Sequence, residues 1–213
     1  DGCDATGTVD DPGPDDIRDA FAWVQQGDLA GDLDDSRVGL MGHSAGAQSI
    51  ASVGTEDTRF QAVLMLGGAD AVSRDVPAAV IDGSCDGVIE PSVTLNAALA
   101  STNAQHARIK DAGHQAFSDI CALDLPALAA QYLEDRTDLN TPFYQLALGL
   151  AEDGCPTAVP DVTDVCSGSY LDLETAAEIL RASATWFFDQ HLRNSGDGLQ
   201  PDEYVELTVT TGG

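Results

Sequence analysis

The sequence predicts an α/β fold built on a doubly wound, mostly parallel sheet, and three observations support this prediction. Short apolar runs alternate with helix-compatible stretches along the chain. The runs end at Gly or Asp, as buried strands do where a loop begins. The stretches between them have the length of the crossover helices that parallel strands require.

The positions of the helices and strands follow from local patterns. Pro14 suits the first turn of a helix, and Ile17 and Phe21 follow it at helical spacing. Asp172 begins a long apolar-striped helix that ends near Asn194. The predicted helices span residues 14–27, 44–53, 91–98 and 172–194, and the predicted strands span 37–41, 60–66, 78–81, 106–110 and 204–209.

The length of the chain, 213 residues, suits one domain with a sizeable core. We therefore expect a single domain over residues 1–213. Between about residues 120 and 169 the alternation of strands and helices breaks, and two helical stretches lead into a loop bracketed by cysteines. We expect this region to be an insertion near the face that carries the functional site.

The charge balance is strongly acidic, with 36 Asp and Glu against 9 Lys and Arg and a net charge of −27 at pH 7. Such a surface repels phosphate backbones and anionic membranes, so we expect no nucleic-acid partner. No apolar run approaches the roughly 20 residues that span a bilayer, so we expect no transmembrane segment. Two explanations of the charge stay open: a solvated acidic surface on a secreted protein, and adaptation to high salt.

The five cysteines are spread along the chain without a CxxC pair, which argues against zinc and thioredoxin-like chemistry. We therefore expect no metal site and no cofactor. Cysteines in an acidic, lysine-poor chain fit an oxidising compartment, so we expect a secreted or periplasmic protein with disulfides. Cys155 and Cys166 make the most economical pair, and Cys3 is free to bond to something outside this chain.

The pentapeptide from Gly42 to Gly46 reads Gly-His-Ser-Ala-Gly and matches the G-x-S-x-G pattern of a nucleophile elbow. A predicted strand leads into it and a small-residue helix leaves it, which is the context that the pattern requires. Because the strand and the helix pass close to each other, we expect that only small residues fit at positions 42 and 46. Ser44 would then project from the sheet, with the N–H of Ala45 aimed at a developing oxyanion. His43 lies inside the elbow, where we expect it to shape the cleft beside the serine.

A serine nucleophile needs a base and an orienting acid, which should follow in the order Ser, Asp, His. Asp86 and His114 each follow a predicted strand, so both belong at the carboxyl edge of the sheet. Asp82 and Asp70 are the rival acids, and the Gly-containing loop around Asp86 favours it over both. Among the other histidines, His106 begins a strand and His191 belongs to the last helix, so we interpret both as surface or packing residues.

Three segments, GHSAGA from position 42, DGSCDGVIEP from position 82 and AGHQAFSD from position 112, together resemble the α/β-hydrolase superfamily. The most similar branch contains platelet-activating-factor acetylhydrolases, dienelactone-hydrolase-like esterases and bacterial polyester hydrolases. The resemblance covers roughly residues 14–121 and the last helix. It implies that Ser44 is the nucleophile, Asp86 the acid and His114 the base.

The resemblance also implies a function and a missing part. The implied reaction is hydrolysis of a small-molecule, lipid or polymeric carboxylic ester through an acyl-enzyme. A polyester hydrolase, a phospholipid acetylhydrolase and an inactive hydrolase-like binding module are the alternatives. Polyester hydrolases usually carry an aromatic residue after the strand that follows the serine. This chain reads LGGADAVS there, with no aromatic residue, so the polyester alternative is less favoured.

Members of the superfamily have further strands before the helix that leads to the serine, and a loop among those strands supplies the second oxyanion donor. No HGG-like loop precedes Pro14, so the strand at 37–41 would be an unpaired edge. We expect an N-terminal segment or a partner chain to complete the sheet.

Overall fold

A five-stranded sheet in the order β1-β2-β3-β4-β5 forms the centre of the computed structural model, which describes residues 13–118 and 170–209. Strands β1 to β4 are parallel and β5 is antiparallel to β4. The predicted fold class, a mostly parallel α/β sheet, is therefore confirmed. The strands are β1 (Gly39–His43), β2 (Ala62–Leu66), β3 (Ala78–Gly83), β4 (Ala104–Ile109) and β5 (Val205–Val209).

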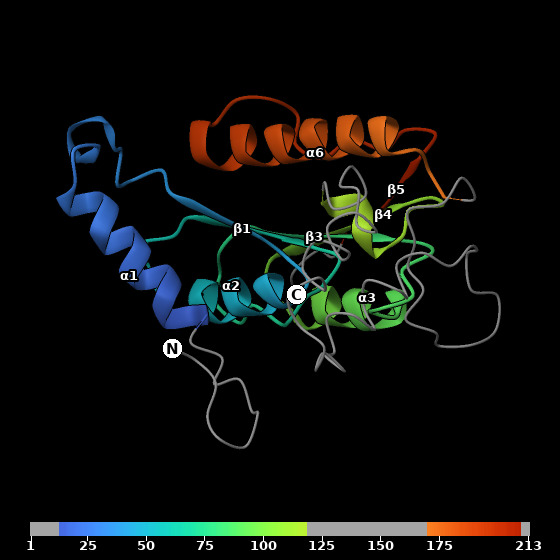
Figure 1. The fold of residues 1–213 in the computed structure, drawn as a ribbon, viewed down its shortest axis with the longest axis horizontal. Coiled ribbons are helices and arrows are strands. Elements are labelled where there is room, and N and C mark those ends of the chain that lie inside the picture. The colour runs from blue at the N-terminus through green and yellow to red at the C-terminus, as the bar shows by residue number, and fades with distance from the viewer. Residues whose placement is uncertain (1–12, 119–169, 210–213) are drawn as a thin grey trace, which may run out of the picture.

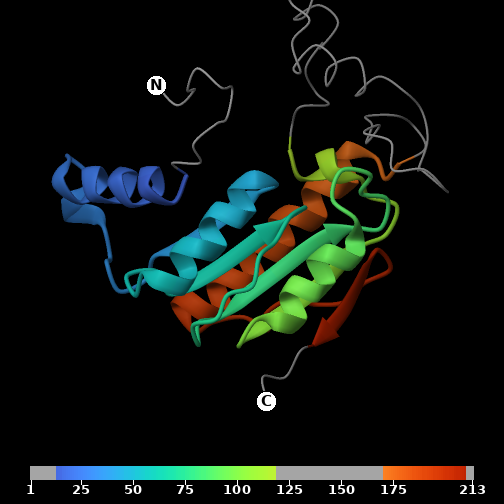
Figure 2. The same ribbon diagram turned by 90° about the horizontal axis from the view of Figure 1, so that it is seen from below.

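Helices cover both faces of this sheet, as a doubly wound fold requires. In Figure 1, α6 lies above the sheet, while α2 and α3 lie below it. Figure 2 shows α2 and α3 in front of the strands, and α1 beyond the β1 side of the sheet. The helices are α1 (Gly13–Gln26), α2 (Ala45–Glu56), α3 (Pro91–Ala100) and α6 (Leu173–Arg193), with short 3-10 turns η1 (Ala30–Asp32) and η2 (His114–Phe117).

The observed elements match the predicted ones, with shifts of a few residues at their ends. The shift of β1 bears most directly on the site, since this strand was expected at 37–41 and lies at Gly39–His43. It ends later because Gly42 and His43 still pair with Met65 and Leu66 of β2. The strand therefore runs up to Ser44 itself and fixes where the serine emerges.

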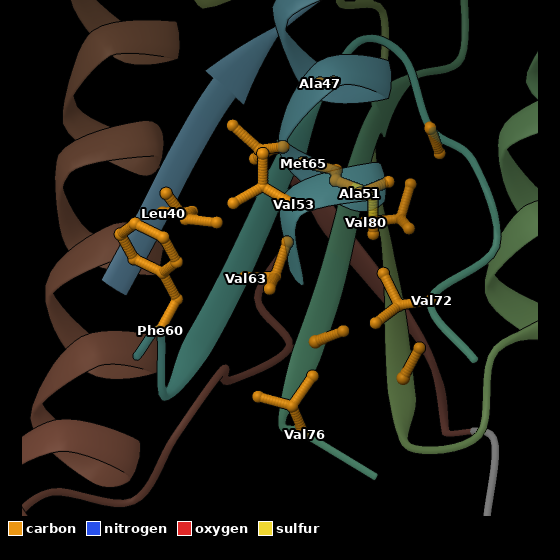
Figure 3. Packing of buried hydrophobic residues seen from close by; sticks show 14 of the residues in the cluster. Leu40, Ala47, Ala51, Val53, Phe60, Val63, Met65, Val72, Val76 and Val80 are labelled. Carbon is orange, nitrogen blue, oxygen red and sulfur yellow. The ribbon is translucent and has the colours of Figure 1, made fainter. Parts of the chain in front are cut away.

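The core on the α2 side holds the first three strands rigidly together. Val63 and Met65 of β2 and Val80 of β3 are fully buried there. Figure 3 shows Met65 and Val80 beside Ala51 of α2, with Val63 farther along β2. Burying each such large side chain stabilises the fold by about 1.5–3 kcal/mol. These strands can therefore hold the loops at their carboxyl ends in fixed positions.

The opposite face is covered by α6, whose limits agree with the prediction. The Asp172 side chain caps the helix by accepting a hydrogen bond from the Thr175 N–H at 2.9 Å. Asn194 ends it in the left-handed conformation, with φ of 51°. Phe187 is fully buried against the sheet and Ile179 is 8% exposed.

Several predictions fall on residues that the structure does not describe. The insertion at 120–169 and the pairing of Cys155 with Cys166 lie outside the described residues. Cys85 is within them and is disulfide-bonded. Among the described residues, no helix combines the length and apolar composition needed to cross a membrane.

Candidate active site

Ser44 occupies the sharp turn between β1 and α2. Its backbone has φ of 56° and ψ of −124°, a conformation that is unusual for a residue with a side chain. The turn is held because the Ser44 N–H donates to the Leu66 carbonyl at 2.9 Å, and the Ser44 carbonyl accepts from the Ala47 N–H at 2.9 Å. The local structure is the strand–turn–helix arrangement expected of a nucleophile elbow.

The two glycines of the pentapeptide have different roles. A Cβ atom at Gly42 would lie 2.5 Å from the carbonyl oxygen of Gly46, so no larger residue fits there. A Cβ atom at Gly46 would meet no described atom within 4 Å. The prediction that both positions must be small is therefore wrong for Gly46, whose own backbone is what crowds Gly42. Gly68 has a comparable constraint, since its Cβ would lie 2.7 Å from the Ser44 carbonyl oxygen.

The three residues expected to form a triad lie in one hydrogen-bonded chain. His114 Nε2 is 2.8 Å from Ser44 Oγ, and His114 Nδ1 is 2.9 Å from Asp86 Oδ2. A carboxylate only accepts, so Nδ1 carries the proton and Nε2 offers its lone pair to the serine hydroxyl. His114 is 2% exposed and Asp86 is 6% exposed, so solvent competes little for these hydrogen bonds.

The loop between β3 and α3 orients Asp86. The other carboxylate oxygen, Oδ1, accepts hydrogen bonds from the N–H groups of Val88 at 2.9 Å and Ile89 at 2.7 Å. Asp86 therefore faces His114 with one oxygen while its own loop holds the other.

The loop that carries Asp86 is bonded directly to the loop that carries His114. The Cys85 N–H donates to the Ala112 carbonyl at 2.9 Å. A Cβ atom at Gly83 would lie 2.1 Å from that same carbonyl oxygen, so only glycine allows this approach. The distance between Asp86 and His114 is thus set by backbone contacts between the two loops.

Asp82, the rival acid, points to the α3 side of the sheet and is fully buried. Arg108 donates to it through Nε and Nη2, each at 2.8 Å, and His106 Nε2 lies 2.9 Å from Oδ2. Burial alone would raise the pKa of Asp82, but the hydrogen bonds from Arg108 and His106 outweigh it and hold the pKa below its usual range. Its hydrogen bonds go to the α3 side and not to His114.

His43 contacts the proposed base. Its Nε2 lies 3.0 Å from the His114 carbonyl oxygen, which can only accept, so Nε2 carries a proton. The centroids of the two imidazole rings are 4.7 Å apart, and the centroid of the Phe117 ring lies 6.0 Å from that of His43. Burial, and next the proximity of His114, lower the pKa of His43. The ring is therefore neutral near pH 7 and holds the backbone of His114.

Ala45 and the remaining candidates have simpler surroundings. Ala45 is the exposed first residue of α2, so its N–H has no acceptor within that helix and lies beside Ser44. Asp70 is exposed and accepts a hydrogen bond from the Ala71 N–H at 2.7 Å. His191 packs on the Phe187 ring at 4.9 Å in α6. Within the part of the chain that the structure describes, no group of His, Cys, Asp and Glu side chains could hold a metal ion.

The sequence did not reveal the partners of Asp82. His106 was interpreted as a surface or packing residue, yet it is 2% exposed and bonded to a carboxylate. A signal was present, since His106 and Arg108 alternate in a short strand and so share one face. Polar residues on a face that should be buried indicate a buried partner.

A cavity of about 430 Å³ opens between η2 and the start of α6. Phe117 lines it and also packs beside His43, so the cavity lies next to the wall of the site. Most of its lining is apolar, with Glu174 and Arg181 as the charged exceptions.

Comparisons with known proteins place the fold. No family model matches the chain, and no curated protein does. Among solved structures, the chain is similar to a ferulic acid esterase from Streptomyces cinnamoneus, with a TM-score of 0.59 and 22% sequence identity. The match covers 92% of this chain and 53% of that one, so the chain spans about half the length of the esterase. Together with the parallel sheet and the turn at Ser44, this likeness shows that the chain has an α/β-hydrolase fold.

Proposed function

We propose that this chain hydrolyses carboxylic esters, with Ser44 as nucleophile, His114 as general base and Asp86 as the orienting acid. The observation that carries the proposal is the hydrogen-bonded chain from Ser44 Oγ through the imidazole to Asp86, at 2.8 and 2.9 Å. A serine hydroxyl is a weak nucleophile, and a base within hydrogen-bond reach is what activates it.

The proposed reaction uses this geometry in two steps. His114 Nε2 takes the hydroxyl proton as Ser44 Oγ attacks the ester carbonyl, and Asp86 stabilises the imidazolium that forms. The imidazolium then returns the proton to the leaving alcohol, which leaves an acyl group on the serine. Water, deprotonated by the same imidazole, attacks the acyl-enzyme and releases the acid. The Ala45 N–H is the proposed backbone donor to the oxyanion in both steps.

The substrate class is proposed from two features. The similar solved structure is named a ferulic acid esterase, which favours a carboxylic ester over a peptide. The largely apolar cavity beside Phe117 offers a place for an apolar acyl or alcohol group. Phospholipid acetyl groups and polyesters belong to the same reaction class and remain the alternative substrates.

A fluorophosphonate probe tests the catalytic proposal, because it labels only an activated serine. We expect the native protein to be labelled and Ser44→Ala to remain unlabelled while it keeps its circular dichroism spectrum. A folded native protein that resists labelling would favour the alternative, a hydrolase-like binding module without activity.

The free edge of β1 supports a second proposal, that further strands complete the sheet. Within the described residues β1 pairs only with β2. Met41 on this edge strand is 56% exposed, and an unpaired apolar edge invites pairing with another strand. We propose that an N-terminal segment or a partner chain pairs here and supplies the second oxyanion donor.

Mass spectrometry of the intact native protein tests this second proposal. We expect a species heavier than the 22.1 kDa of these residues, or a partner that copurifies. Because the loss of one oxyanion donor costs about 10²–10³ in rate, residues 1–213 alone should be correspondingly slow. A fully active, folded 22.1 kDa species without a partner would contradict it.

We also propose a secreted or periplasmic location. The disulfide at Cys85 and the strongly acidic composition support it, since disulfides persist in oxidising compartments. Fractionation of the producing cells, with thiol counting on the purified protein, tests this proposal.

A further inference from the structure

A buried ionic cluster lies between β3, β4 and α3. Asp82 of β3 is its centre and accepts hydrogen bonds from Arg108 and His106 of β4 and from the hydroxyl of Thr94 in α3. Asp82 and Thr94 are fully buried, and His106 is 2% exposed. The cluster therefore joins three elements through one carboxylate.

The same cluster is hydrogen-bonded to residues at both ends of the loop that carries Asp86, which spans residues 84–90. The loop starts directly after β3, in which Asp82 is the second-last residue. The loop is followed by Pro91, the first residue of α3. The Pro91 carbonyl accepts a hydrogen bond from Arg108 Nη2 at 2.7 Å and lies 2.9 Å from the Thr94 hydroxyl. Arg108 thus bonds the start of the loop, through Asp82, and its end, through Pro91.

A shift of this loop would move the acid relative to the base. Asp86 Oδ1 is held by N–H groups of the same loop, and Oδ2 meets His114 at 2.9 Å. The carboxylate therefore moves with the loop backbone. A displacement of about 1 Å in such a positioning group can cost about 10²-fold in rate.

Stability alone does not account for a charge in this place. A buried ion pair is expensive to desolvate, and well-packed apolar residues often replace one without loss of stability. His106 also leaves Nδ1 buried without a partner among the described residues, which adds to that cost. The cluster forms directional hydrogen bonds at the two ends of one loop, which an apolar core could not do.

We infer that Asp82 is a positioning residue, which with Thr94 and Arg108 fixes the loop that presents Asp86 to His114. This inference rests on the proposed esterase function. It assigns to Asp82 no contact with substrate and no proton transfer.

The test measures turnover for each active serine in the full native protein, with p-nitrophenyl acetate as substrate and fluorophosphonate titration to count labelled sites. If Asp82 is purely structural, its substitution lowers the number of labelled sites. If Asp82 is a positioning residue, its substitution lowers the turnover at each labelled site. We expect Asp82→Asn to lower kcat for each labelled site by about 10- to 100-fold with KM unchanged.

Thr94 provides a milder variant pair in case Asp82→Asn does not fold. Thr94→Val removes the hydroxyl at nearly constant shape and should lower kcat for each site, while Thr94→Ser should restore it. Val76→Ala is the matched control. Val76 is buried two residues before β3, at the end far from Asp82, so this variant should lose stability but not turnover for each site.

The inference is overturned if Thr94→Val has the same kcat for each site as Val76→Ala and Thr94→Ser. It is also overturned if a folded Asp82→Asn variant keeps the wild-type kcat for each site. The proposed function fails separately, if Ser44→Ala is still labelled and active. The two failures are therefore distinguishable.

Discussion

Two buried Asp–His pairs lie close together in this protein, and they differ in what the second imidazole nitrogen meets. Asp86 and His114 are 2.9 Å apart, and so are Asp82 and His106. The free nitrogen of His114 reaches Ser44 Oγ, whereas Nδ1 of His106 is buried without a partner among the described residues. The carboxylate–imidazole distance is therefore equal in the two pairs, although it involves Nδ1 of His114 and Nε2 of His106, and only the imidazole of His114 also contacts a serine hydroxyl.

The difference teaches that an Asp–His hydrogen bond does not by itself indicate catalysis. Asp82 also binds Arg108, so its charge is neutralised inside the core. Asp86 has backbone N–H groups and one imidazole as partners, so its charge stays available to stabilise an imidazolium. The further partners of the two carboxylates therefore distinguish the proposed orienting acid, Asp86, from the buried ion pair of Asp82.

The largest expected effect separates the two histidines. His114→Ala should lower kcat by about 10⁵- to 10⁶-fold, because the serine loses its base. His106→Gln keeps an N–H that can reach Asp82 and should retain most of the activity. Steady-state rates on p-nitrophenyl acetate measure both, and equal losses in the two variants would erase the distinction between the pairs.

The next effect separates the two aspartates. Asp86→Asn should lower kcat by about 10⁴-fold, because an amide leaves His114 in the wrong tautomer. Asp82→Asn should lower it far less, since Asp82 acts only through the loop. If the order of the two losses is reversed in pre-steady-state acylation rates, the acid is Asp82.

A smaller effect concerns His43, a partner that only the Asp86–His114 pair has. His43→Ala removes the hydrogen bond to the His114 carbonyl, worth about 1 kcal/mol, and should lower kcat by about fivefold. His43→Gln can still donate to that carbonyl and should recover part of the rate. An unchanged kcat in His43→Ala would show that the backbone of His114 needs no such support.

The last effect concerns the pH dependence of stability and not the rate of catalysis. The folded protein holds the pKa of Asp82 below its ordinary value of 3.8, so this group stabilises the fold above that pH. The stabilisation is lost as the pH falls through the lower folded-state pKa. Asp82→Asn should lose about 3 kcal/mol at neutral pH and show a flatter decline in acid.

Urea unfolding between pH 2 and pH 7 measures this dependence, and Asp34→Asn is the control. Hydrogen bonds from Ser36 and Arg37 lower the pKa of Asp34, but its side chain is 44% exposed. Solvent screens such a surface pair, so Asp34→Asn should change the curve much less. Superimposable curves for Asp82→Asn and the native protein would contradict the role of the buried cluster.

The local sequence determined the secondary-structure elements and the order of the proposed catalytic residues along the chain. Short apolar runs closed by Gly or Asp predict the strands, because a buried strand needs apolar side chains on both faces. The pentapeptide predicts the turn at Ser44, because the approach of the Gly46 backbone to Gly42 leaves no room for a Cβ atom. The carboxyl ends of the parallel strands then place Asp86 and His114 at the same edge as the serine.

Only the tertiary structure decided which aspartate meets which histidine. Asp82 and Asp86 both follow the predicted strand at 78–81. The Gly-containing loop around Asp86 favours it as the acid, but the local sequence does not state which face either side chain takes. The register that pairs Asp82 with Arg108 puts this carboxylate on the α3 side. The bond between Cys85 and Ala112 brings the next loop to His114. Both facts depend on β4 lying beside β3, a long-range contact that a local sequence pattern does not encode.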